Sequence, residues 1–72
     1  MVYTLYLKHA TRQRPERTGY HDIDLERLLD FGRGYVRGVN DVARDGRYSA
    51  IICDDQLKPI KKVTKEGWIE NA

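Results

Sequence analysis

Residues 24–46 read DLERLLDFGRGYVRGVNDVARDG, and this stretch decides the fold. Its apolar residues recur three and four positions apart, which places them on one side of an α-helix with 3.6 residues per turn. No other run of the chain has this period, and the remaining segments are short and strand-like. The sequence therefore predicts an α+β fold in which one amphipathic helix packs on a small antiparallel sheet. The apolar side carries Leu25, Leu28, Leu29, Gly32, Tyr35, Val36, Val39, Val42 and Ala43.

The predicted helix has recognisable signals at both ends. Asp22 and Asp24 precede the apolar period, and either side chain can accept the free N–H groups of a first helical turn. One of the two is the expected N-cap. Asp45-Gly46 is the expected stop, with Arg44 favourably placed in the last turn.

Three glycines weaken the helix prediction. Each of Gly32, Gly34 and Gly38 costs about 1 kcal/mol relative to alanine in a helix interior. The apolar spacing nevertheless continues in phase through all three, which favours a single helix. A break or kink between Gly32 and Gly34 is the main alternative. Gly32 lies on the apolar side, where a missing Cβ allows close approach to the sheet.

Four other segments predict strands, so the expected element order is β-β-α-β-β. Residues 2–8 alternate, with the odd-numbered side chains on the buried face, and residues 18–23 pair back on them. Residues 48–53 form the most apolar strand and are expected at the centre of the sheet. Residues 59–64 return beside them, with Lys61 and Lys62 suited to an edge. A short final strand is a further option, and Trp68 is expected to close one end of the core.

The first two strands are joined by a polar segment that predicts a hairpin with an arginine-rich tip. Pro15 denies a backbone donor to any strand ladder, so the turn is expected to centre on it. In that register His9 falls opposite His21. With Asp22 nearby, two imidazoles and one carboxylate can hold a divalent ion, but ordinary exposed histidines explain the same residues.

Composition limits the function classes. The 72 residues leave room for one domain, residues 1–72, and the net charge of +2 is too weak to establish a nucleic-acid partner. Cys53 is the only cysteine and lies in an apolar run, which favours a buried structural thiol and a reduced compartment. No apolar stretch approaches the ~18 residues of a membrane span. The expected setting is the cytoplasm of a host cell, with a homodimer favoured by an exposed strand edge or leftover apolar helix surface.

Arginines carry the strongest functional signal. Three of them occupy the predicted hairpin tip near Tyr6 and Tyr20, where they can contact a phosphate backbone or an acidic protein patch. The alternative is a solvated tip with no partner. A second pair of arginines stacks one turn apart on the outer side of the helix, a like-charge arrangement that an acidic group would relieve. The expected partner-binding residues are Arg12, Arg14, Arg17, Tyr20, Arg33 and Arg37.

The aspartates give a weaker indication of a catalytic site. Asp22, Asp24, Asp54 and Asp55 together with Lys58 or Lys61 match the residue types of a metal-dependent nuclease. A helix cap and a turn explain the same aspartates, and a core this thin leaves little room for a catalytic pocket of the usual ~300 Å³. We therefore expect no enzymatic activity, no cofactor and no bound metal.

The pattern as a whole resembles a group of very small phage and mobile-element proteins. The resemblance rests on the aromatic strand VYTLYL (residues 2–7), the acidic helix start DIDLE (residues 22–26) and the closing hairpin around IICDD (residues 51–55). The group includes single-helix, antiparallel-sheet anti-CRISPR proteins. The resemblance covers most of the chain but is architectural, so no functional residue is carried over from it.

This resemblance implies a non-enzymatic inhibitor that acts by occupying a surface. The leading hypothesis is a protein that sterically blocks a host defence protein or ribonucleoprotein complex, such as a CRISPR effector, through its basic surface. Direct binding of RNA or single-stranded DNA is the alternative, and a metal-dependent nuclease is the weaker one. A membrane partner is not expected.

Overall fold

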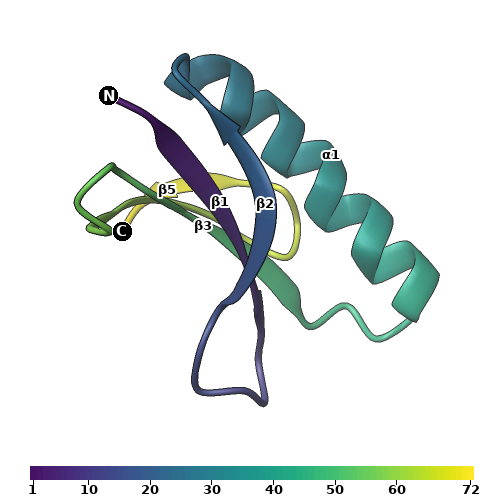
Figure 1. Ribbon diagram of the computed structural model, residues 1–72. Coiled ribbons are helices and arrows are strands. Elements are labelled where there is room, and N and C mark those ends of the chain that lie inside the picture. The colour runs from purple at the N-terminus through teal and green to yellow at the C-terminus, as the bar shows by residue number, and fades with distance from the viewer.

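One helix lies across one face of a five-stranded antiparallel sheet in the computed structural model, which describes all of residues 1–72 (Figure 1). The predicted α+β class is therefore confirmed. The sheet order is β2-β1-β3-β4-β5, with the helix following β2 in the chain. No helix is both long enough and apolar enough to cross a membrane. The elements are β1 Tyr3–His9, β2 Glu16–Asp22, α1 Leu25–Ala43, β3 Tyr48–Cys53, β4 Pro59–Val63 and β5 Ile69–Asn71.

The helix runs without a break through all three glycines. Asp24 is the N-cap, and its carboxylate accepts a hydrogen bond from the backbone N–H of Arg27 at 3.3 Å. The C-cap is Arg44, which is in the left-handed region at φ 58°, so the helix ends just before the predicted Asp45-Gly46 stop. Close packing explains one of the glycines, because a Cβ on Gly32 would lie 3.4 Å from Leu5 Cδ1.

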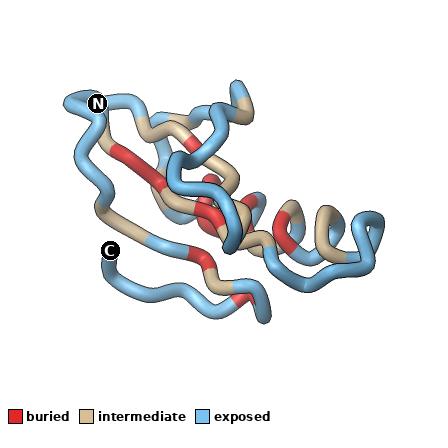
Figure 2. The backbone as a smooth tube through the Cα atoms, turned by 90° about the horizontal axis from the view of Figure 1, so that it is seen from below, coloured by how far each residue is buried: buried red, intermediate tan, exposed pale blue.

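The core lies where the helix meets the middle of the sheet. Leu5 of β1 is opposite Ile52 of β3, and both are fully buried, as the odd-face prediction for β1 and the central position of β3 require. In Figure 2 the buried stretches are short, and the chain ends are exposed. The buried cluster is Leu5, Leu28, Leu29, Val36, Ala50, Ile52 and Val63.

The register of the first hairpin differs from the prediction. His21 pairs with Thr4, whereas His9 pairs with Tyr48 of β3, so the two histidines lie at opposite ends of β1. The turn occupies residues 10–15 rather than centring on Pro15, and the register shifts once within the β1–β2 pairing. The prediction was wrong because Pro15 lies at the end of the turn, just before β2, so it did not mark the centre about which the two strands pair.

The C-terminal end of the sheet also differs. A fifth strand pairs with β4, so Lys61 and Lys62 lie on an interior strand and the edges are β2 and β5. Trp68 is 67% exposed and does not close the core. Gly67 is buried in its place, in the turn between β4 and β5, with φ +90°.

Candidate binding surface on the open face of the sheet

The face of the sheet that points away from the helix, here called the open face, gathers both charged and apolar side chains. Successive residues of a strand point to opposite faces, so Tyr6 and Ile51 face away from the core formed by their neighbours Leu5 and Ile52. A row of directly paired residues crosses the whole sheet on this face. The row is Arg17, Tyr6, Ile51, Lys62 and Glu70.

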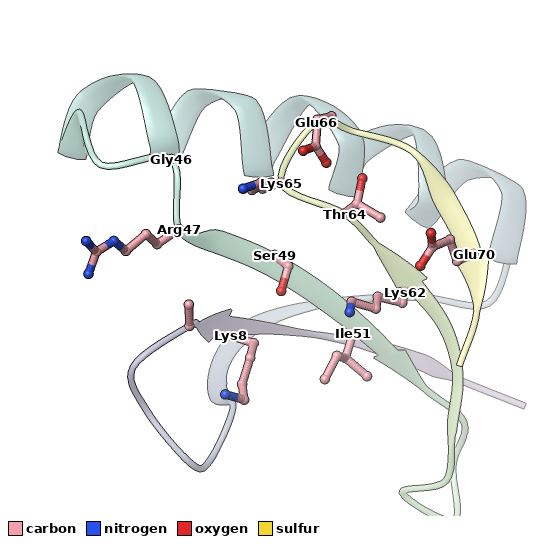
Figure 3. A pocket seen from close by; sticks show the side chains of 11 residues that line it. Lys8, Gly46, Arg47, Ser49, Ile51, Lys62, Thr64, Lys65, Glu66 and Glu70 are labelled. Atoms are coloured by element: carbon pink, nitrogen blue, oxygen red, sulfur yellow. The ribbon is translucent and has the colours of Figure 1, made fainter.

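A hollow of about 620 Å³, here called the basic hollow, opens beside this row (Figure 3). Four of its lining residues are cationic and two are acidic, so its lining carries a net positive charge. This space is larger than the thin core led us to expect. The cations are Lys8, Arg47, Lys62 and Lys65, and the acids are Glu66 and Glu70.

The cations of the basic hollow take part in none of the ion pairs of the molecule, which join His9 to Asp45, Arg12 to Glu16 and Arg27 to Asp22. The Lys8 ammonium instead donates hydrogen bonds to backbone carbonyls of His9 and Arg12, and so ties down the neighbouring loop. In Figure 3, Lys62 reaches from β4 toward Ile51. The positive charge of the hollow is therefore not neutralised by a carboxylate within ion-pair distance.

A smaller space of about 270 Å³, here called the apolar pocket, adjoins the basic hollow and shares Ile51 with it. Its base includes Cys53, which is buried as predicted. Burial raises the pKa of the Cys53 thiol, and the charge of Asp54 raises it further, so the thiol is protonated at neutral pH and lacks the thiolate of a reactive cysteine. The lining residues are Tyr6, Pro15, Ile51, Cys53, Leu57 and Pro59.

Residues 10–15, here called the arginine loop, project from the end of the sheet between β1 and β2 (Figure 1). Arg12 is exposed and forms an ion pair with Glu16, and Arg14 is exposed beside Pro15. Arg17 lies in β2, directly opposite Tyr6, on the open face. Because Pro15 lines the apolar pocket, the loop forms one wall of it. Of the predicted binding residues, Arg17 therefore lies on the open face, and Arg12 and Arg14 lie in the loop beside it.

Tyr20 lies elsewhere. Its ring packs at 4.5 Å from Phe31 and 5.4 Å from Tyr35 of the helix, measured between ring centroids, on the face opposite to Tyr6. The two tyrosines that the sequence placed beside the same loop therefore cannot contact one ligand segment together. The aromatic cluster leaves 41% of Phe31 exposed, which is the apolar helix surface expected to favour a homodimer. The homodimer stays a prediction.

Arg33 and Arg37 also lie outside the open face. Arg33 Nε donates a hydrogen bond to the carbonyl of Gly67 at 3.0 Å, and the Arg37 guanidinium lies against the same glycine. A backbone carbonyl therefore takes one donor of Arg33, and a role of this pair in partner binding stays a prediction. The two side chains connect the helix to the turn between β4 and β5, and we leave them out of the candidate surface.

The histidines and aspartates are not gathered into one site. His9 bonds to Asp45 at 3.0 Å, and this hydrogen bond lowers the pKa of Asp45. Asp22 forms two hydrogen bonds with Arg27, which hold the pKa of that carboxyl well below its usual range. Asp54 accepts backbone hydrogen bonds in the turn between β3 and β4. No three His, Cys, Asp or Glu side chains lie close enough together to share a metal ion.

Sequence reasoning missed most of the open-face residues. Lys62 was assigned to a strand and Leu57 to a turn without a functional role, and Lys8 was considered only as a neighbour of the arginine loop. The alternation of β1 could have placed Lys8 beside Tyr6 on the outer face, but the pairing of β1 with β3 joins residues that are 39 to 49 positions apart. No local pattern reveals such a pairing.

The comparisons with known proteins add no relative: no family model matches the chain, and neither the curated proteins nor the solved structures contain a significant match.

Proposed function

We propose that this chain is a non-enzymatic binding protein that lays the open face of its sheet on an anionic surface of a larger partner and blocks that surface. The partner we favour is a host defence protein or ribonucleoprotein complex, as the resemblance to anti-CRISPR proteins implies. The proposal depends most on one observation, the basic hollow whose cations have no carboxylate partner within the molecule.

Two properties of this face support a binding role. The fold leaves it uncovered, because the single helix packs on the other face. Its cations come from β1, β4 and two connecting segments, so their arrangement depends on a rigid sheet rather than on one mobile loop. Cations with complementary charges on a partner increase the rate of association and exclude partners of like charge.

Neighbouring lysines on opposite faces provide the test. Lys62 is paired with Ile51 on the open face, whereas Lys61 is paired with Ile52 on the covered face. Wild-type protein and the variants Lys62→Glu and Lys61→Glu are immobilised and used to capture proteins from a bacterial lysate. Charge reversal at Lys62 is expected to reduce recovery of a specific partner by about tenfold or more, because like charges across an interface cost several kcal/mol. Equal losses from both variants would contradict the proposal.

Direct binding of single-stranded nucleic acid is a second candidate, favoured by Arg17 and Lys62 on either side of the Tyr6 ring in the same cross-sheet row. The two candidates differ in their salt dependence. Binding to nucleic acid weakens log-linearly with salt as counterions are released, and it is lost when the lysate is treated with nuclease. Capture that survives nuclease and moderate salt supports the protein partner.

A further inference from the structure

The apolar pocket narrows the kind of partner that fits the open face. Its six lining residues offer almost only carbon and sulfur surface, from proline, leucine, isoleucine, cysteine and one tyrosine. A nucleobase placed there would leave the donors and acceptors of its edge without partners, which is unfavourable in a desolvated site. An aliphatic or aromatic amino-acid side chain has no such groups. The pocket is therefore suited to a hydrophobic side chain of a protein.

Leu57 gives an independent indication that this pocket has a binding role. It is 64% exposed and adopts φ +63° in the turn between β3 and β4, the left-handed region where glycine is favoured. The carboxylate of Asp54 holds the turn by accepting hydrogen bonds from the backbone N–H groups of Gln56 at 2.9 Å and Lys58 at 3.0 Å. A glycine would satisfy this backbone with less strain. The leucine adds only an exposed apolar wall, and strained positions of this kind are concentrated at ligand-binding sites.

Positive charge lies on two sides of the pocket. The arginine loop borders it through Pro15, and Arg17, just after the loop, is paired directly with the lining residue Tyr6. The basic hollow borders it through Ile51, with Lys62 directly opposite that residue. An apolar centre with a charged rim is the usual anatomy of a protein interface, in which a few buried anchor side chains provide most of the affinity. Because the rim is positively charged, it favours a partner with acidic side chains.

We propose that the open face recognises an acidic protein segment that carries one hydrophobic anchor residue. The anchor enters the apolar pocket, and carboxylates on either side of it contact the basic hollow and the arginine loop. This inference depends on the proposed function, since it names the chemistry of the partner for the same face.

Two peptides and an RNA test the inference by NMR titration of the ¹⁵N-labelled full chain. The first probe is a short peptide rich in aspartate and glutamate with a central leucine, the second replaces that leucine by serine, and the third is oligouridylate. The leucine peptide is expected to bind about tenfold or more tightly than the serine peptide, because it buries one aliphatic side chain. Its shifts should include the amides of Ile51, Cys53 and Leu57.

The variant Leu57→Gly separates a binding role from a structural one. Glycine relieves the strained φ, so the melting temperature should stay the same or rise. The ratio of the affinities for the leucine and serine peptides should fall from about ten to about one. Ile23→Ala is the matched control, because Ile23 is also an exposed aliphatic residue, 73% accessible, but lines none of the hollows of the molecule. This control should bind both peptides as the wild type does.

The outcomes distinguish the two proposals. Equal affinity for both peptides, or tighter binding of oligouridylate, would overturn the acidic-segment inference and leave the proposed anionic partner in place. Loss of stability in Leu57→Gly with unchanged peptide preference would also overturn it, by showing a purely structural leucine. Failure of all three probes to shift any open-face amide would count against both proposals.

Discussion

The two faces of the sheet differ in how their residues are used: the covered face packs against the helix, and the open face carries the binding role that we propose. Ile51 and Ile52 are neighbours on β3, yet Ile52 is fully buried under the helix and Ile51 joins the basic hollow to the apolar pocket. The covered face contributes only apolar side chains to the buried cluster. The open face mixes charge with apolar surface. One helix can cover only one face, so the other is available for a partner.

The arginines follow the same division. On the helix side, Arg33 is bound to the Gly67 carbonyl and Arg27 to Asp22, so both serve the packing of α1. Around the open face, Arg17 and Arg47 take part in no ion pair. Residue type alone therefore does not show which arginines are held by partners within the molecule.

Truncating the two isoleucines of β3 would test this division most strongly. We expect Ile52→Ala to lower the free energy of unfolding by about 2–5 kcal/mol, because it leaves a cavity in the packed core. Ile51→Ala, which removes the same atoms from a half-buried position, should cost clearly less. Urea unfolding of both variants measures the difference. Equal losses would show that the open face is as important to folding as the covered face.

The helix glycines allow a finer comparison of the covered and outer sides. A Cβ on Gly34 would meet nothing within 4 Å, so Gly34→Ala should stabilise the protein by about 1 kcal/mol through helix propensity. Gly32→Ala should gain less, because its Cβ would press on Leu5 at 3.4 Å. Thermal unfolding ranks the two variants. A larger gain at Gly32 would mean that the helix packs less closely on the sheet than the structure shows.

Lowering the pH should reduce the free energy of unfolding through Asp22, which pairs with Tyr3 of β1 and binds Arg27 of the helix. Its pKa is lowered in the folded state, so the folded protein binds fewer protons than the unfolded chain, and stability falls as the pH drops below about 4. Asp22→Asn should flatten this loss. Unfolding curves measured between neutral pH and pH 3 test this prediction. We expect this change in stability to be smaller than those predicted for the isoleucine and glycine variants.

Local patterns predicted the helix and the alternation of β1 well. The helical spacing of the apolar residues in 24–46 correctly predicted that the helix continues through its glycines. One of the two candidate caps, Asp24, is the N-cap, and this was predictable because capping depends on residues only a few positions away. The exposure of Trp68 was not predictable in the same way, and the short β5 could be given only as an option. A three-residue strand has too little pattern of its own and exists because β4 offers it an open edge.

The amino-acid sequence was enough to predict the fold class, the single helix and the arginine-rich loop, since each of these depends on side chains within a few residues of one another. The three-dimensional fold was needed to show which face each charge occupies, that Tyr6 and Tyr20 lie apart, and that Leu57 and Lys62 border one surface. These relations depend on strand pairings between distant residues. A shift of one position in such a pairing moves every side chain of a strand to the opposite face.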